Sequence, residues 1–158
     1  MKKILYSACM ILAVCAAFVS CQKDVVVGLE PATDNPAEVL HGKSFRGQMV
    51  RSLDGASDSL EAVLSIVDCD SIHGHCIDVT VSCSGLGVDG TSVANVASED
   101  GYGYVFYNTS TANGLEATTG FRGRVSGDVA TINFIKSVKA GFKKKDYSFS
   151  FQGSLVTE

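Results

Sequence analysis

The densest group of reactive side chains in the sequence runs from Asp68 to Cys76 and reads Asp-Cys-Asp-Ser-Ile-His-Gly-His-Cys. Two thiols and two imidazoles are the ligand types of a tetrahedral zinc site. However, His73 and His75 stand only two positions apart in a short loop, and the sequence indicates no ligand from elsewhere. We therefore expect no metal site. We favour a disulfide between Cys69 and Cys76, because the N-terminal residues described below indicate export, and paired cysteines in exported proteins are usually oxidised. Free thiols and a metal centre are the alternatives.

The segments that flank these cysteines decide whether the disulfide can form. Residues 60–68 allow two interpretations. Their apolar side chains have helical spacing, whereas pairing with residues 76–83 gives one apolar and one mostly polar face. We favour the strand, and Cys83 would then face the core as an unpaired thiol. The expected cross-strand partners are Ile66 with Val79, Leu64 with Val81, Ser65 with Thr80, and Val67 with Asp78.

No other stretch of the sequence indicates catalysis or a cofactor. There is no Gly-x-Ser-x-Gly and no His-Glu-x-x-His pattern. Residues 85–90 match Gly-x-Gly-x-x-Gly, but that pattern predicts dinucleotide binding only when a helix follows it. Residues 91–96 have the composition of a strand instead. We therefore expect a loop at 85–90, no cofactor, and a protein that is not an enzyme.

The N-terminal residues indicate export. Two lysines precede an apolar run from Ile4 to Val19, which is typical of a signal peptide and shorter than the ~20 residues of a membrane-spanning helix. The following Phe18-Val19-Ser20-Cys21 resembles the lipobox of bacterial lipoproteins, although Phe18 stands where that family usually has Leu. The resemblance implies cleavage after residue 20 and lipidation of Cys21. An ordinary signal peptide with a spare thiol is the alternative.

The lipobox divides the chain into three parts. Residues 1–20 would be the signal peptide, Cys21 with the segment up to residue 34 a lipidated tether, and residues 35–158 a single β-rich domain. A flexible tether of this length has an r.m.s. reach of about 20 Å, and acyl chains give durable anchoring to a membrane. Gln22-Lys23-Asp24 resembles the surface-export signal of Bacteroides-type lipoproteins. We expect an outer-membrane lipoprotein that faces either the periplasm or the cell surface.

The charge balance argues against nucleic acid as a partner. Without Lys2 and Lys3 the 13 Lys and Arg become 11, against 17 Asp and Glu, so the chain from Cys21 onward carries a formal charge of −6. Nucleic-acid-binding domains usually present a basic face. The main basic run is interpreted as a solvated loop beside a strand rather than an anion site. It comprises Lys136, Lys139, Lys143, Lys144 and Lys145.

Short alternating apolar and polar runs broken by Gly and Asp predict an all-β domain of about eight strands after one short helix. Asn35, Pro36 and Gly42 are suitable for the cap, first position and end of that helix. Asp54-Gly55, Asp100-Gly101 and Gly127-Asp128 suit tight turns between strands. The clearest strands are residues 44–53, 92–99, 102–107 and the last one, in which Tyr147, Phe149, Phe151 and Leu155 share a face.

Eight antiparallel strands in a meander can close into a barrel. This order resembles the calycins, the lipocalin-like barrels, over most of residues 36–158. Calycins usually carry Gly-x-Trp near the first strand, whereas this chain has Phe45-Arg46-Gly47 there and no Trp. The first alternative is a twisted sheet wrapped on a helix at residues 58–67, as in BPI-type lipid-binding domains. A β-sandwich is the second alternative.

These features predict a non-catalytic envelope lipoprotein that binds a small apolar or lipid-like ligand inside the barrel. The candidate ligand-binding residues are Tyr102, Tyr104 and Phe106, whose spacing places them on one face of a strand. The alternatives are a module that binds another protein or a surface glycan, and a hydrolase whose site is not visible in the sequence. Ser59 and Ser71 lie in Asp-Ser-aliphatic patterns that resemble the O-glycosylation signal of Bacteroides-type exported proteins.

Overall fold

The computed structural model describes residues 35–69, 75–99, 101–109, 114–140 and 142–157. The chain divides into two compact units, Met1–Thr33 and Asp34–Glu158, and every element below belongs to the second unit. The predicted signal peptide, Cys21 and the tether therefore lie outside the described residues. Within the described residues, no helix is both long and apolar enough to span a membrane.

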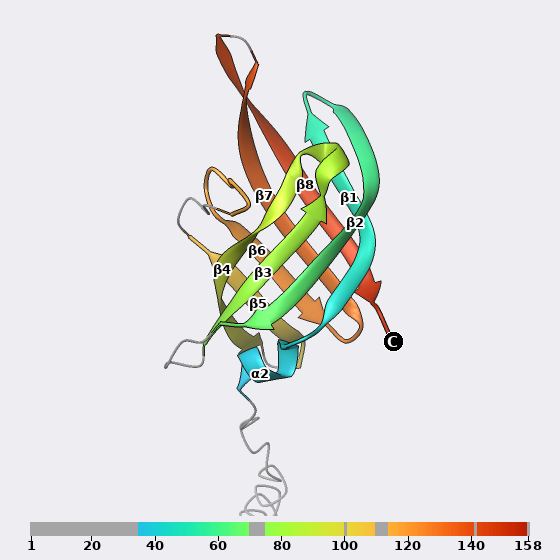
Figure 1. Ribbon diagram of the computed structural model, residues 1–158, viewed down its shortest axis with the longest axis vertical. Coiled ribbons are helices and arrows are strands. Elements are labelled where there is room, and N and C mark those ends of the chain that lie inside the picture. The colour runs from blue at the N-terminus through green and yellow to red at the C-terminus, as the bar shows by residue number, and fades with distance from the viewer. Residues whose placement is uncertain (1–34, 70–74, 100, 110–113, 141, 158) are drawn as a thin grey trace, which may run out of the picture. The chain divides into compact units, whose positions relative to one another are not determined.

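Eight antiparallel strands form a closed barrel in simple up-and-down order, and the first strand pairs with the last (Figure 1). This confirms the predicted all-β, eight-stranded meander. Because the ring of hydrogen bonds is complete within Asp34–Glu158, this unit contains what it needs to fold by itself. The elements are α2 (Pro36–Leu40), β1 (Ser44–Leu53), β2 (Ala56–Asp68), β3 (Cys76–Cys83), the 3₁₀ turn η2 (Ser84–Leu86), β4 (Val88–Glu99), β5 (Gly103–Asn108), β6 (Phe121–Ser126), β7 (Val129–Ala140) and β8 (Lys143–Leu155).

Local sequence signals account for the hairpins. Asp54 and Gly55 both have positive φ, 49° and 84°, the backbone of a two-residue turn whose twist matches the flanking strands. The turn after β6 likewise places Gly127 at φ 56°. These turns fix the registers of the strands that they join. The register between β2 and β3 is the predicted one, with Ile66 opposite Val79.

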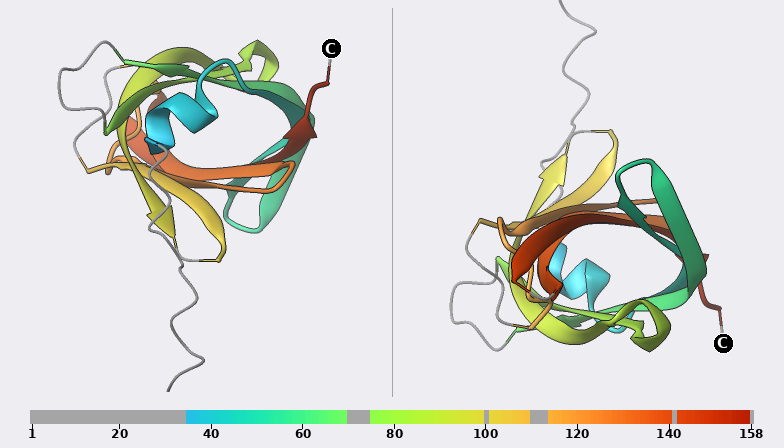
Figure 2. Two further views of the ribbon diagram at one scale, coloured as in Figure 1. Left: turned by 90° about the horizontal axis from the view of Figure 1, so that it is seen from below. Right: turned by 90° about the horizontal axis from the view of Figure 1, so that it is seen from above.

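The helix α2 closes one end of the barrel (Figure 2). The side chain of Asn35 accepts a hydrogen bond from the backbone N–H of Ala37 at 3.1 Å, and Pro36 occupies the first turn, as predicted. Ala37 and Leu40 are fully buried against the barrel core. At the other end, Leu86 of η2 and Leu115 are also buried.

Side chains fill the interior of the barrel. Gly123 lies on the inner face of β6, and a Cβ atom built there would lie 2.1 Å from Cζ of Phe106. A Cβ on Gly153 would meet the ring of Phe151 at 2.5 Å. These glycines therefore make room for aromatic rings. The fully buried large side chains are Phe45, Phe106, Phe151, Leu40, Met49, Leu64, Ile66, Ile77, Leu115, Ile132, Val79 and Val81.

Three expectations need correction. Residues 58–67 belong to strand β2, so the helix of the BPI-like alternative does not exist. The predicted loop at 85–90 ends early, because β4 begins at Val88. The lysine run is not a loop, since β7 and β8 continue as paired strands to Ala140 and Lys143. The helical spacing in residues 60–67 fails as a signal because β2 buries alternate residues in its second half, from Ala62 onward.

Candidate ligand groove on the outer face of the barrel

A groove of about 1000 Å³ lies on the outer face of strands β4 to β8. Its position follows from strand alternation, because Phe106, Phe121 and Phe134 point into the core and their neighbours point outward. The lining residues comprise Val105, Tyr107, Arg122, Asn133, Ile135, Ser148 and Ser150. They are joined by parts of the largely buried Phe121, Phe134 and Phe149, of β4, and of the segments that flank β5 and β6.

The strand registers align four of these outward side chains in one row, called the polar row below. Tyr107 of β5 pairs with Arg122 of β6, Arg122 with Asn133 of β7, and Asn133 with Ser150 of β8. Adjacent strands lie about 4.8 Å apart, so the row extends roughly 14 Å across the sheet. It presents one aromatic ring and then three hydrogen-bonding side chains in sequence.

Arg122 supplies a positive charge that is not neutralised in the polar row. It is exposed and makes no ion pair among the residues that the structure describes. By contrast, its neighbour on the same strand, Arg124, donates a hydrogen bond to Glu99 and has its guanidinium 5.6 Å from the ring centroid of Tyr102. The Nε atom of Arg124 is buried and has no hydrogen-bond partner among the described parts of the chain.

Asn108, at the end of β5, also lines the groove and connects β5 to β4. Its side-chain amide donates a hydrogen bond to the carbonyl of Val93 on β4 at 2.7 Å. This bond ties the end of β5 to β4 next to Tyr107. Tyr107, which is 40% exposed, is therefore next to a backbone position that this hydrogen bond holds against β4.

The structure does not bring the three predicted ligand-binding residues together. Phe106 is fully buried and meets the ring of Phe121 edge-on, at 6.4 Å between centroids. Tyr104 packs partly buried against the core, whereas Tyr102 lies in the turn and is 66% exposed. The alternation breaks at Gly103, whose φ of 103° redirects the backbone before β5 begins.

The predicted disulfide between Cys69 and Cys76 is present, with Cα atoms 5.7 Å apart. This separation suits a hydrogen-bonded antiparallel pair, and the backbone N–H of Cys69 donates to the carbonyl of Cys76. Cys83 is a buried free thiol, as predicted. His73 lies outside the described residues. In the described part of the chain, no three His, Cys, Asp or Glu side chains cluster as metal ligands would.

The two predicted glycosylation sites differ in what the structure says of them. Ser59 is exposed on β2, where it lies opposite Val50, and its hydroxyl donates to Oε1 of Gln48 at 2.9 Å. It therefore lies within a strand and not in a turn. Ser71 falls outside the described residues. Whether either serine carries a glycan stays a prediction.

Paired charges tie together the end of the barrel opposite α2. Lys136 donates to the carbonyl of Gly87 at 2.8 Å and forms an ion pair with Glu116 at 2.6 Å. The hydrogen bond from Lys136, together with its charge, lowers the pKa of the Glu116 carboxyl. On the same rim, Arg51 pairs with Asp58. These cations are partnered, which distinguishes them from Arg122.

Sequence reasoning missed the polar row as a site. A signal was available in the alternation of β5, which places Val105 and the aromatic Tyr107 together on the face opposite Phe106. Comparison with known proteins gives no match: no family model, no curated protein and no solved structure is significantly similar to this chain. The interpretation of the groove therefore depends on its own chemistry.

Proposed function

We propose that this protein is a lipid-anchored envelope lipoprotein whose barrel is a non-catalytic module that binds a glycan in the outer groove. The observation that carries the proposal is the polar row formed by Tyr107, Arg122, Asn133 and Ser150. The row has a spacing of about 4.8 Å per strand, which is close to the length that each sugar unit adds to an extended glycan chain. Successive side chains of the row would therefore meet successive sugar units.

Each member of the row has a chemical role in this proposal. The exposed face of Tyr107 would stack on the apolar C–H face of a sugar ring, since aromatic rings provide large apolar contact at low entropic cost. Asn133 and Ser150 both donate and accept hydrogen bonds, as sugar hydroxyls require. Arg122 would bind hydroxyl oxygens or, in an acidic glycan, a carboxylate through a bidentate contact.

The filled interior of the barrel favours a ligand outside it. An apolar molecule inside would need the volume that the rings of Phe106 and Phe151 occupy over Gly123 and Gly153. Both ends of the barrel are also lined by buried side chains, Leu40 at one end and Leu115 at the other. The packing thus supports the glycan-binding alternative over a lipid in the core.

The test of the groove is a glycan-array screen of residues 34–158, followed by calorimetric titration of any glycan that binds. Tyr107→Ala and Arg122→Ala should each weaken binding about tenfold, the scale of a central contact worth above 1 kcal/mol. The controls are Phe142→Ala and Arg46→Ala, which remove an exposed aromatic residue and an exposed arginine that do not line the groove. A preference for acidic over neutral sugars that disappears in Arg122→Ala would assign a carboxylate to that residue.

Two results would contradict the proposal. One is glycan binding that persists unchanged in both groove variants. The other is a lipid-sized mass retained by residues 34–158 in native mass spectrometry, which would place the ligand inside the barrel. The anchor has its own test, because Cys21→Ser should abolish labelling of the full chain with fatty acid in cells, and labelling that continues would disprove the lipobox.

A further inference from the structure

The hairpin of β7 and β8 extends beyond the barrel as a two-stranded ribbon (Figure 1). The pairing of β8 with β1 ends at Ser148, and the pairing of β7 with β6 ends at Phe134. Beyond these points Thr118 still forms hydrogen bonds with Ile135 and Ser137 of β7. The ladder between β7 and β8 then continues as far as Ala140 opposite Lys143. The ribbon therefore ends in a narrow tip on the far side of the barrel from α2.

The tip carries four lysines on both faces of the ribbon: Lys139, Lys143, Lys144 and Lys145. All four are exposed, and none makes an ion pair among the residues that the structure describes. Lys139 and Lys144 stand directly opposite each other, an arrangement of like charges that destabilises a β-ladder. This self-repulsion would be relieved by an anionic partner, and it occurs in a chain whose net charge is negative.

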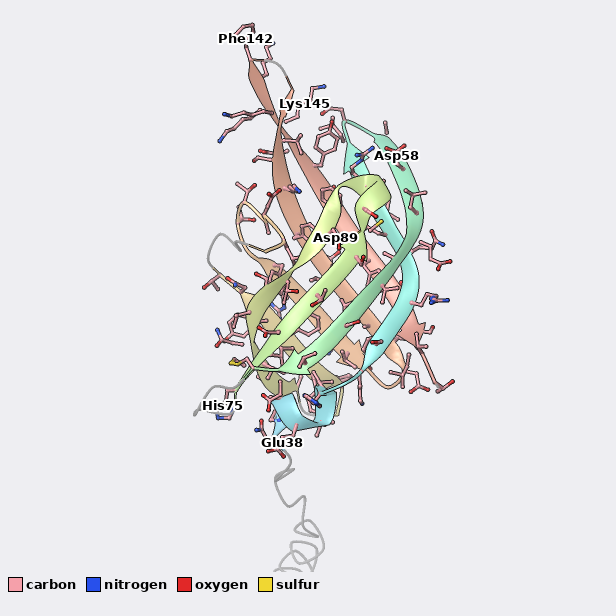
Figure 3. All side chains as sticks on the ribbon, viewed as in Figure 1. Glu38, Asp58, His75, Asp89, Phe142 and Lys145 are labelled. Atoms are coloured by element: carbon pink, nitrogen blue, oxygen red, sulfur yellow. A yellow bond between two sulfur atoms is a disulfide. The ribbon has the colours of Figure 1, made fainter. Side chains whose placement is uncertain are left out.

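Phe142 lies beside these lysines at the end of the hairpin (Figure 3). Its side chain is fully exposed, with a relative accessibility of 111%, the highest among the exposed large apolar residues described. An aromatic ring in such a position gains from leaving water. One ring at a narrow tip offers far less surface than the roughly 800 Å² per partner of a stable protein interface.

We propose that the tip of the β7–β8 hairpin docks on an anionic lipid bilayer, with Phe142 inserted at the interface and the four lysines against lipid headgroups. A bilayer satisfies both features at once, because the aromatic ring enters the interfacial region while lysines interact with anionic lipids. A purely polyanionic partner would use the lysines and leave the ring exposed. This contact is independent of Cys21 and of the outer groove.

The absence of Trp from the chain permits a direct test. Phe142→Trp in residues 34–158 introduces a single tryptophan at the tip. The control is Tyr102→Trp, which introduces a single tryptophan at the exposed turn before β5. On addition of vesicles containing phosphatidylglycerol, the emission of Phe142→Trp should shift to the blue and be quenched by lipids brominated in their acyl chains. The Tyr102→Trp emission should not change. Equal shifts in both variants, or none in Phe142→Trp, would overturn the proposal.

Co-sedimentation with the same vesicles separates the ring from the charges. Phe142→Ala should weaken vesicle binding about tenfold. The double substitution Lys143→Ser with Lys144→Ser should weaken it about 25-fold, because each lysine contributes about fivefold to the affinity. Lys43→Ser, which removes a lysine next to α2, should have little effect, and added salt should weaken binding of the unaltered domain. Two results would refute an anionic bilayer as the partner: equal binding to neutral phosphatidylcholine vesicles, or binding to heparin but to no vesicle.

Discussion

The substitution Gly123→Ala tests whether the barrel interior is filled as described. The new Cβ would lie 2.1 Å from Cζ and 2.2 Å from Cε2 of Phe106, and 2.7 Å from the carbonyl oxygen of Thr131. Phe106 is fully buried, so its ring can move away only by displacing the side chains packed around it. Overpacking of this kind costs about 3 kcal/mol at the upper end of its usual range.

The assay is equilibrium unfolding of residues 34–158 in urea, followed by circular dichroism. A loss of about 3 kcal/mol moves the midpoint down by about 1.5 M if the m-value is near 2 kcal/mol per M. Gly85→Ala is the matched control, since its Cβ would meet only Cδ1 of Leu60, the end of a side chain that is 44% exposed. That control should lose less than about 1 kcal/mol.

A second substitution identifies the clash as the cause. Phe106→Leu alone should cost about 1.5 kcal/mol of lost apolar burial, but combined with Gly123→Ala it removes the ring atoms that the new methyl would strike. The double variant should therefore be about 2 kcal/mol more stable than the sum of the single losses implies. Additive losses, or a Gly123→Ala variant as stable as Gly85→Ala, would refute the view that Phe106 fills this space.

The other predictions concern the disulfide and the rim of the barrel. Thiol counting on the denatured, unreduced residues 34–158 should find one free thiol, that of Cys83, and three free thiols would contradict the disulfide. The double substitution Cys69→Ser with Cys76→Ser should lower the free energy of unfolding by about 2.5 kcal/mol, the value for so small a loop. Because Lys136 lowers the pKa of Glu116 in the folded state, this carboxylate stabilises the fold above its unfolded pKa of about 4.5 and loses that effect as pH falls through the folded value. Glu116→Gln should therefore flatten the acid side of the stability profile, and an unchanged profile would show that the ion pair does not contribute.

Local turn chemistry made most of the fold predictable from the sequence. Gly127-Asp128 and the Cys69–Cys76 pair each fix a register, and a register determines which side chains of two strands share a face. The length of the β7–β8 hairpin could not be found in this way, because the lysines at its end were interpreted as a solvated loop. The inward-facing glycines that leave room for aromatic rings were also missed. In the sequence alone, Gly123 looks like a break in a strand, because the ring of Phe106 that it accommodates cannot be identified there.

The groove was beyond sequence reasoning for a different reason. Tyr107, Arg122, Asn133 and Ser150 come from four strands, and their alignment depends on three successive registers. An error of one residue in any of them would move part of the row to the inner face. A site of this kind is a property of the assembled sheet and has no contiguous signature in the chain.

The pairing of β1 with β8 has a consequence for how the chain folds. Every other ladder joins neighbouring strands and can form locally, whereas Phe45 meets Leu155 only across almost the whole domain. Until this seam closes, the ribbon of strands has two unpaired edges, which are templates for association with other chains. Closing it requires the latest-synthesised strand and the largest loss of chain entropy. The seam is therefore where we expect the rate-limiting step of folding and the greatest exposure to aggregation.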